Sequence, residues 1–244
     1  MAEIIIVGLG PGPLELLTRE ARKVLEEAPR VFFRYATDPV AQSLIAHGKD
    51  IVSFERLYAN PSLTYLAIYK LIVKAIIHEA KLRGTAVFAL PGNPYVFEKT
   101  PRWIEEYIKR HGEDIKVSIV AGMSFLDLIY PTLGIDPEEG IVILNASRMA
   151  EVPEFYAPVP RLGCLIGQLG LPLGDKSTGA KTNFDIVLEV LRENYPDDHP
   201  AVLVFSKGYP DFTTDKIHTT IKGLTTYSES INNLTSLYIP PLSV

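Results

Sequence analysis

An α/β fold in two domains is predicted from two features of the 244-residue sequence. In the first half, short apolar runs rich in β-branched residues alternate with segments of helical periodicity, which is typical of a parallel sheet covered by helices. Beyond residue 134, proline-bearing stretches and fewer helical segments separate the strand-like runs, which indicates a mixed sheet. We therefore expect an N-terminal domain over residues 1–120 and a C-terminal domain over residues 121–244.

The elements of the first half are bounded by apolar runs and capping residues. Thr18 is suited to cap the start of a helix, and Gly84 and Gly112 are suited to end helices. The expected strands are 3–7, 30–34, 50–54, 85–90 and 115–120, and the expected helices are 19–27, 39–47, 63–83 and 95–110. In the second half we expect strands at 141–144, 162–167, 201–206 and 235–239, with helices near 183–194 and 213–223.

Composition narrows the range of partners. The net charge of −5 and pI of about 5.6 lack the basic excess of a protein that tracks phosphates, so no nucleic-acid partner is expected. Cys164, the single cysteine, lies in the apolar run "LGCLIG" and is expected to be a buried core residue rather than a nucleophile. No disulfide framework is available to one cysteine, which suits a reducing compartment.

Two stretches of the sequence bear on where in the cell the protein is expected. The first strand begins within two residues of Met1, which leaves no room for a signal peptide, so we expect a cytoplasmic protein. The stretch "LAIYKLIVKAII" carries Lys70 and Lys74 and is read as an amphipathic helix rather than a membrane span.

Familiar catalytic patterns do not match the sequence. The histidines at 47, 78, 111, 199 and 218 show no paired spacing and have no cysteine partners, so no metal site is expected. The sequence also lacks the Gly-x-Ser-x-Gly elbow of α/β hydrolases. The sequence therefore predicts neither a metal-dependent mechanism nor the serine nucleophile of an α/β hydrolase.

Glycine- and proline-bearing loops follow the expected strands instead. "GLGPGP", "LPGNP" and "VAGMS" lie at strand carboxyl ends, where open α/β sheets bind ligands. The first loop fails the dinucleotide fingerprint, because Pro13 stands where the third glycine should be. Pro11 and Pro13 also lack the N–H groups that hold a phosphate. These loops suit a ligand bound through backbone groups and apolar walls, although a tight strand-to-helix turn explains "LPGNP" about equally well.

The order of several motifs resembles the tetrapyrrole (corrin/porphyrin) methylase family. These are "VGLGPGPLELLT", "ALPGNPYVFEKT", "VAGMSFLDLIYPTLGIDP", "DDHPAVLVF" and "TSLYIPP", which together span nearly the whole chain. Within the family the chain looks most similar to methylase-like domains fused to MazG-type pyrophosphohydrolases. It is also similar to the borosin peptide backbone N-methyltransferases, notably in "GQLG" and "SLYIPP".

The resemblance implies a Rossmann-like N-terminal domain, a mixed C-terminal domain, a homodimer and S-adenosylmethionine as cofactor. Carried over motif by motif, the implied cofactor-binding residues are Pro91, Gly92, Asn93, Val96, Phe97, Ser124, Gln168, Val202, Thr235 and Ser236, with Gln168 placed on a strand of the second domain. The loop of Gly10, Pro11 and Gly12 would face the methyl acceptor.

The acceptor and the catalytic groups stay open at this stage. Many tetrapyrrole methylases carry an aspartate where this chain has Pro13, whereas the borosin resemblance points to Tyr65 and Tyr69 as catalytic residues. The corresponding arginine is not found near Pro61 and Ser62, and the two tyrosines are equally explained as packing on one helix face. A methyltransferase acting on a small molecule or a peptide is our first hypothesis, and an inactive cofactor-binding module that regulates a partner enzyme is the alternative.

Overall fold

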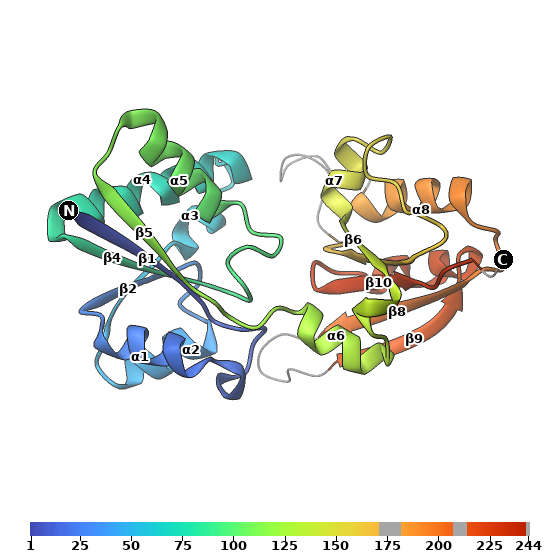
Figure 1. Cartoon of the computed structure of the whole chain (residues 1–244), viewed down its shortest axis with the longest axis horizontal. Coiled ribbons are helices and arrows are strands. Elements are labelled where there is room, and N and C mark those ends of the chain that lie inside the picture. The colour runs from blue at the N-terminus through green and yellow to red at the C-terminus, as the bar shows by residue number, and fades with distance from the viewer. Residues whose placement is uncertain (171–181, 207–213, 243–244) are drawn as a thin grey trace. The chain divides into compact units, whose positions relative to one another are not determined.

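The computed structural model describes residues 1–170, 182–206 and 214–242. The chain divides into two compact units, Met1–Phe125 and Leu126–Val244, each with its own sheet (Figure 1). Each unit is described by itself below.

The first unit is built on a parallel sheet with the strand order β3-β2-β4-β1-β5. Its strands are β1 (Ala2–Gly8), β2 (Arg30–Phe33), β3 (Asp50–Ser53), β4 (Thr85–Leu90) and β5 (Ile115–Val120). Its helices are α1 (Arg19–Glu27), α2 (Pro39–Ala46), α3 (Glu55–Ala59), α4 (Tyr65–Arg83) and α5 (Thr100–His111), with a short 3₁₀ turn at Leu14–Leu16. The alternation of strands and helices predicted from the sequence is confirmed.

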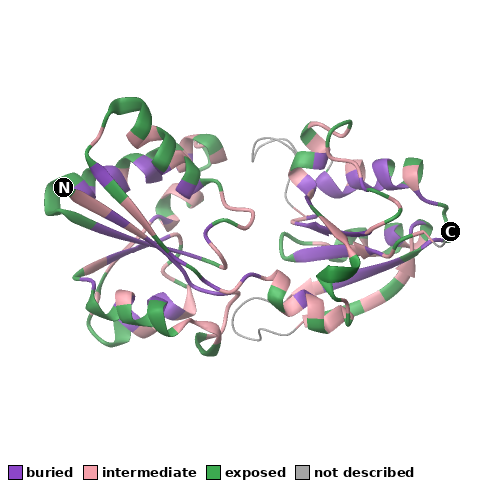
Figure 2. Ribbon diagram, in the orientation of Figure 1, coloured by how far each residue is buried: buried purple, intermediate pink, exposed green. Residues whose placement is uncertain are grey.

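Helices cover both faces of this sheet. Successive strand residues point to opposite faces, so each strand contributes side chains to two cores. Ile4 and Phe88 pack on the face covered by α4 and α5, whereas Val7 and Val87 pack on the face covered by α1 and α2 (Figure 1). Buried strands between exposed helix surfaces are visible in Figure 2. The strands therefore read as continuous apolar runs rather than alternating ones.

The capping residues act as the sequence predicts. The Thr18 hydroxyl accepts a hydrogen bond from the amide of Ala21 at 3.1 Å. Gly84 and Gly112 end α4 and α5 in the left-handed conformation, with φ of 81° and 61°. Each cap satisfies a backbone group that the helix end leaves without a partner.

The predicted helix 95–110 begins later than expected. The chain from Asn93 to Lys99 is a loop, and α5 starts only at Thr100, with Pro101 in its first turn. The carboxylate of Glu98 accepts from the amide of Thr100 at 2.8 Å, so the helix start is fixed by a side chain outside the helix.

The second unit holds a mixed sheet with the strand order β6-β7-β10-β8-β9. Its strands are β6 (Ile141–Asn145), β7 (Gly163–Gly167), β8 (Pro200–Ser206), β9 (Thr214–Thr220) and β10 (Thr235–Ile239). Its helices are α6 (Leu126–Leu133), α7 (Ala146–Glu151) and α8 (Asn183–Asn194), with 3₁₀ segments at Pro137–Glu139 and Lys222–Ser230. Only β6 and β7 run parallel among the described pairs, which confirms the predicted mixed pairing.

The helix predicted near 213–223 is wrong. Residues Thr214–Thr220 form β9, the edge strand that pairs antiparallel with β8, and residue 213 lies outside the described residues. Its threonines and Ile217 are β-branched, and pairing with β8 decides the conformation over the weak helical spacing.

The core of the second unit lies between one face of its sheet and helices α7 and α8. Cys164 belongs to this core with no exposed surface, as predicted, together with Leu203, Leu237 and Met149. Among the described residues of both units, no helix is long and apolar enough to cross a membrane.

Candidate functional site

The carboxyl ends of β1 and β4 meet at a topological switch point. These strands are neighbours, yet the chain leaves β1 towards β2 and leaves β4 towards β5, on opposite sides. Ligands of open α/β sheets bind outside such a point. Gly10 and Gly92, which follow these two strands, join there in an isolated antiparallel bridge. The sequence-predicted residues Gly10, Pro11 and Gly12 thus lie beside the predicted loop that starts at Pro91.

Glycines allow the loops after β1, β4 and β5 to touch through their backbones. A Cβ atom at Gly122 would lie 2.4 Å from the carbonyl oxygen of Gly92, and one at Gly8 would lie 2.5 Å from the amide nitrogen of Gly122. No side chain fits in these contacts. By contrast, a Cβ atom at Gly92 would have no heavy atom nearer than the Met123 carbonyl oxygen at 4.0 Å, so this side of the loop is open within the first unit.

Asn93 ties the loop after β4 to the loop after β5. Its side-chain amide donates to the carbonyl oxygen of Gly122 at 3.0 Å, and its side-chain oxygen accepts from the amide of Tyr95 at 3.0 Å. Both ends of the Asn93 amide are therefore used inside the first unit. Val96 closes the same turn, with its amide donating to the Asn93 carbonyl at 3.1 Å.

Phe97 has an unusual backbone conformation. Its φ of 56° is in the left-handed region, which costs a residue with a side chain about 1–2 kcal/mol. Its ring packs at 5.5 Å from the ring of Phe125, one residue after the buried Ser124. The predicted residues Asn93, Phe97 and Ser124 are thus gathered on adjoining loops.

Arg34, which directly follows β2, clamps the far end of the loop after β4. It forms an ion pair with Glu98, and its guanidinium donates to the hydroxyl of Thr100 at 3.2 Å. The other Glu98 oxygen accepts from the Thr100 hydroxyl at 2.6 Å. The side chains of Arg34 and Glu98 are only 16% and 8% exposed, so water screens this pair far less than it screens surface pairs.

The Arg34 guanidinium has two further properties. Burial, the largest single effect, acts to lower its pKa, but the charge of Glu98 together with the surrounding tyrosines raises the pKa above its ordinary value. Its Nε atom is buried and has no hydrogen-bond partner within residues 1–170, 182–206 and 214–242. A buried donor in that condition costs about 1–3 kcal/mol.

Tyr69 lies over this guanidinium. The Cζ atom of Arg34 is 5.3 Å from the Tyr69 ring centroid, a cation–π distance, and the Trp103 ring meets Tyr69 edge-on at 5.8 Å. Tyr65 stands one helical turn before Tyr69 at the start of α4, and the rings of Tyr35 and Tyr58 pack 5.0 Å apart beside Arg34. An arginine does accompany the predicted tyrosines, and it comes from the end of β2 rather than from the segment before α4.

Burial sets the protonation of these phenols. It raises the pKa of Tyr69 above its ordinary value, and the positive charge of Arg34 only partly opposes this. The pKa of Tyr58 is raised in the same way. At neutral pH both groups are uncharged, so Tyr69 is better suited to form a hydrogen bond than to abstract a proton.

The predicted residues of the second unit are only partly brought together. β7 ends at Gly167, and Gln168 follows it with φ of 62° instead of lying on the strand. The Gln168 side chain accepts from the Asn145 amide at 2.7 Å, which orients it at the carboxyl ends of β6 and β7. Next to it, the amide of Leu169 donates to the carbonyl of Thr235 at 3.3 Å.

Thr235, Ser236 and Val202 point to different sides of the second sheet. Thr235 shares the face of the α7 and α8 core, and its hydroxyl accepts from the amide of Asn232 at 3.0 Å. Ser236 and Val202 alternate to the other face. Val202 pairs with Tyr238, about 10 Å along the sheet from the pair of Thr235 with Phe205.

Sequence reasoning did not identify Gly8, Gly122, Arg34 or Glu98. One signal was available for Arg34, because a charged residue directly after the buried run "VFF" stands at the carboxyl edge of the sheet. No comparable signal links Arg34 to Glu98. Among the described residues, no group of His, Cys, Asp and Glu side chains could hold a metal ion.

The chain is similar in sequence to known proteins over most of its length. The family model of the tetrapyrrole (corrin/porphyrin) methylases matches residues 3–224. The protein YabN of Bacillus subtilis is 31% identical over 240 residues, which cover 98% of this chain and 45% of YabN. A methyltransferase and type III borosin cyclic peptide precursor of Anomoporia bombycina is 27% identical, over 98% of this chain and 28% of that protein. The chain thus spans less than half the length of these two relatives.

A solved structure has the same fold. The uroporphyrin-III C-methyl transferase of Thermus thermophilus, crystallised with S-adenosylhomocysteine, superposes with a TM-score of 0.66 at 18% identity, covering 98% of this chain and 97% of that one. The match of the family model over residues 3–224 covers most of the chain. The chain belongs to the tetrapyrrole (corrin/porphyrin) methylase family.

Proposed function

We propose that this protein is an S-adenosylmethionine-dependent methyltransferase. The observation that carries the proposal is the neutral loop of residues 91–97, which is fixed at a switch point by the Gly10–Gly92 bridge and by Asn93. A loop held at several points presents its backbone groups in one shape, and a preformed shape lowers the entropic cost of binding.

The charge of the loop suits this cofactor. S-adenosylmethionine has no phosphate, carries a positive sulfonium and needs neutral or weakly negative surroundings there. Residues 91–97 include no ionisable side chain except that of Tyr95, and Arg34, the nearest buried cation, is paired with Glu98. No uncompensated positive charge in this loop would oppose the sulfonium.

Several residues would hold the cofactor in the first unit. The residues proposed for this role are Pro91, Gly92, Val96, Phe97 and Ser124, and Asn93 keeps the loop in place. In the second unit we extend the proposal to Gln168, Val202, Thr235 and Ser236.

When bound, the cofactor supplies a methyl group that is already activated, so the protein has to align the acceptor and exclude water. Tyr65 and Tyr69 are proposed to face the acceptor as hydrogen-bonding groups. The loop of Gly10, Pro11 and Gly12 is proposed to shape the same side. No carboxylate stands in that loop to take a proton from the acceptor.

Two acceptor classes are open to this chemistry. The borosin relative at 27% identity supports a peptide backbone amide, and the family supports a tetrapyrrole-like macrocycle. The non-catalytic alternative gains no support, since the borosin relative and the superposed Thermus thermophilus protein are both methyltransferases.

The test combines binding with turnover. Titration calorimetry with S-adenosylhomocysteine and S-adenosylmethionine should give saturable heat. Methyl-labelled cofactor is then incubated with a reduced uroporphyrin macrocycle or with an apolar peptide, and label should appear in one of the two. Absence of binding overturns the proposal, and binding without transfer to either acceptor or to any component of a cell extract favours the non-catalytic module.

The proposal extends to the oligomeric state of the protein and to its compartment in the cell. We propose a cytoplasmic homodimer, on the basis of the family resemblance and the single buried cysteine. Light scattering after gel filtration should then give twice the 27.1 kDa of one chain.

A further inference from the structure

We infer that Arg34 is a positioning residue that couples the proposed cofactor loop to the proposed acceptor-side tyrosines. The inference rests on the proposed function and deepens it. Arg34 touches the end of the loop through Glu98 and touches helix α4 through Tyr69. One rigid side chain thereby sets the spacing between the two parts of the site that must be aligned for methyl transfer.

Both carboxylate oxygens of Glu98 have partners in the first unit. One Glu98 oxygen pairs with Arg34, while the other accepts from the amide of Thr100 at 2.8 Å and from its hydroxyl at 2.6 Å. Arg34 closes the set by donating to the same hydroxyl at 3.2 Å. The guanidinium fork is suited to this arrangement, because it holds its donors in a fixed plane, which a lysine ammonium does not.

The loop needs such a clamp next to Phe97. Phe97 keeps a φ of 56°, and a strained conformation persists only when its surroundings over-determine it. Asn93 fixes the chain four residues before Phe97, and Glu98 fixes it one residue after. Without Arg34 the second anchor is weakened, because among the described residues only Thr100 then holds Glu98, and the loop is expected to relax towards an unstrained backbone.

The contact with Tyr69 carries the coupling into helix α4. The guanidinium lies 5.3 Å from the Tyr69 ring centroid, and Tyr69 in turn meets Trp103 of α5. Trp103 is the single tryptophan of the sequence, so its fluorescence reports on this cluster alone. A signal from the site can therefore be measured without a known acceptor.

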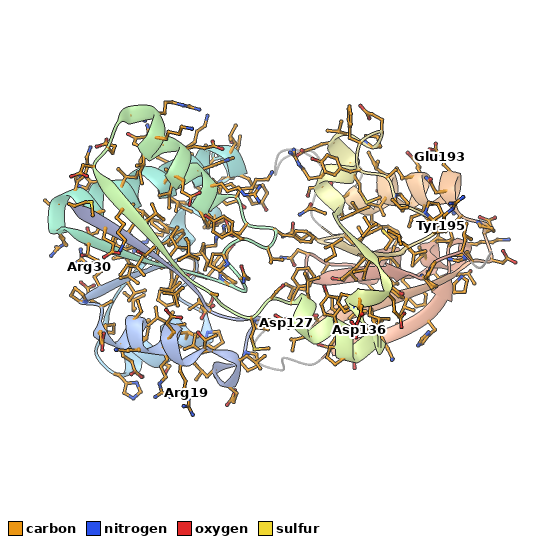
Figure 3. All side chains as sticks on the ribbon, viewed as in Figure 1. Arg19, Arg30, Asp127, Asp136, Glu193 and Tyr195 are labelled. Carbon is orange, nitrogen blue, oxygen red and sulfur yellow. The ribbon has the colours of Figure 1, made fainter. Side chains whose placement is uncertain are left out.

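Arg30 offers a matched control on the same strand. It lies at the amino end of β2 (labelled in Figure 3), where it pairs with Asp50 at 2.7 Å and with Glu79 at 3.4 Å. Its ion pairs therefore join β2 to β3 and α4 away from the loops that follow the carboxyl ends of the strands. Loss of Arg30 removes the same charge and two ion pairs, one more than loss of Arg34 removes, without touching the loop.

The test compares Arg34→Met, Arg34→Lys, Glu98→Gln and the control Arg30→Met. The dissociation constant for S-adenosylhomocysteine is measured by calorimetry, and Trp103 emission is recorded on the same folded samples with excitation at a wavelength that tyrosine does not absorb. We expect Arg34→Met to weaken binding at least tenfold and to shift the emission, Arg34→Lys to restore part of both, and Arg30→Met to match the wild type.

The outcomes separate this inference from the proposed function. If the wild type binds and a folded Arg34→Met binds within twofold of it, with unchanged emission, the inference is overturned. If the wild type does not bind, the proposed function fails, and the emission of Arg34→Met against Arg30→Met still decides whether Arg34 orders the cluster. Should Arg34→Met not fold, Arg34→Lys and Glu98→Gln decide by the same two measurements.

Discussion

The amide of Gly92 donates to the carbonyl oxygen of Gly10 at 2.7 Å, and the amide of Gly10 donates back to the carbonyl oxygen of Gly92 at 3.2 Å. This reciprocal pair is an isolated antiparallel bridge beyond the ends of the parallel strands β1 and β4. Both residues have positive φ, of 78° and 70°, which glycine adopts without strain, so the chain can turn sharply at the carboxyl ends of these strands.

Gly122→Ala is expected to destabilise the protein strongly. The new Cβ atom would lie 2.4 Å from the Gly92 carbonyl oxygen and 2.6 Å from the Gly8 carbonyl carbon, both of which are backbone atoms in a buried junction. We expect a loss of about 3 kcal/mol or more in the free energy of unfolding, the upper end of the overpacking range.

Gly48→Ala is the control for Gly122→Ala, measured by urea denaturation. Gly48 has a φ of 75° but no heavy atom within 4 Å of its added Cβ, so its replacement should cost about 1 kcal/mol from backbone strain alone. Equal losses in the two variants would show that the glycine junction is not closely packed.

Asn93→Ala should loosen the loop after β4. The change removes the hydrogen bond to the Gly122 carbonyl and the bond from the Tyr95 amide. At about 1 kcal/mol for each hydrogen bond, the free energy of unfolding should fall by about 1–2 kcal/mol. If the proposed function is right, the affinity for S-adenosylhomocysteine should fall as well.

Asn60→Ala separates these two effects. The side-chain oxygen of Asn60 also accepts a backbone hydrogen bond from two residues ahead, from the amide of Ser62 at 2.9 Å, and this bond lies within one loop. Its replacement removes one hydrogen bond within a single loop and should therefore cost less stability and leave cofactor affinity unchanged. An Asn93→Ala variant as stable as Asn60→Ala would contradict the bridging role.

Cys164 should resist thiol reagents in the folded protein. It has no exposed surface, and burial raises its pKa to about 12, so little of the reactive thiolate forms at neutral pH. With dithionitrobenzoate we expect no rapid labelling of the native chain and one equivalent in guanidinium. Rapid labelling under native conditions would show that the second core opens readily.

Tyr195 should make the protein less stable at alkaline pH. Burial raises the pKa of Tyr195 to about 12, and the nearby Cys164 thiolate adds to this effect, whereas a tyrosine in an unfolded chain titrates near 10. Between these values the unfolded chain binds fewer protons than the folded one, so the free energy of unfolding falls as pH rises through this window. Below pH 10 this group contributes no pH dependence.

Tyr195→Phe tests that expectation through urea denaturation at several pH values from 7 to 11. The hydroxyl of Tyr195, labelled in Figure 3, is buried without a hydrogen-bond partner in the part of the chain that the structure describes. The variant should match or exceed the wild type by up to about 1 kcal/mol at pH 7 and lose less stability above pH 10. Superimposable pH profiles would rule out a role for Tyr195.

Much of the fold could be predicted from local patterns. The bounds of α1, α8, β4, β5 and β10 agree with the sequence prediction, because apolar runs and capping residues such as Thr18 act within a few residues of themselves. The prediction was wrong at β9, where pairing with β8 decides the conformation, and at the start of α5, where Glu98 supplies the first hydrogen bond.

The candidate site divides in the same way. By itself the sequence determined which loops follow the strands and that "LPGNP" is neutral, rigid and rich in backbone groups, since these are properties of residue types. Only the tertiary structure decided that Arg34 meets Thr100, 66 residues further on, that Gly8 touches Gly122, and that Thr235 and Ser236 point to opposite faces. Contacts of that kind depend on strand order and register, which arise from packing the whole sheet and are not encoded in any short segment.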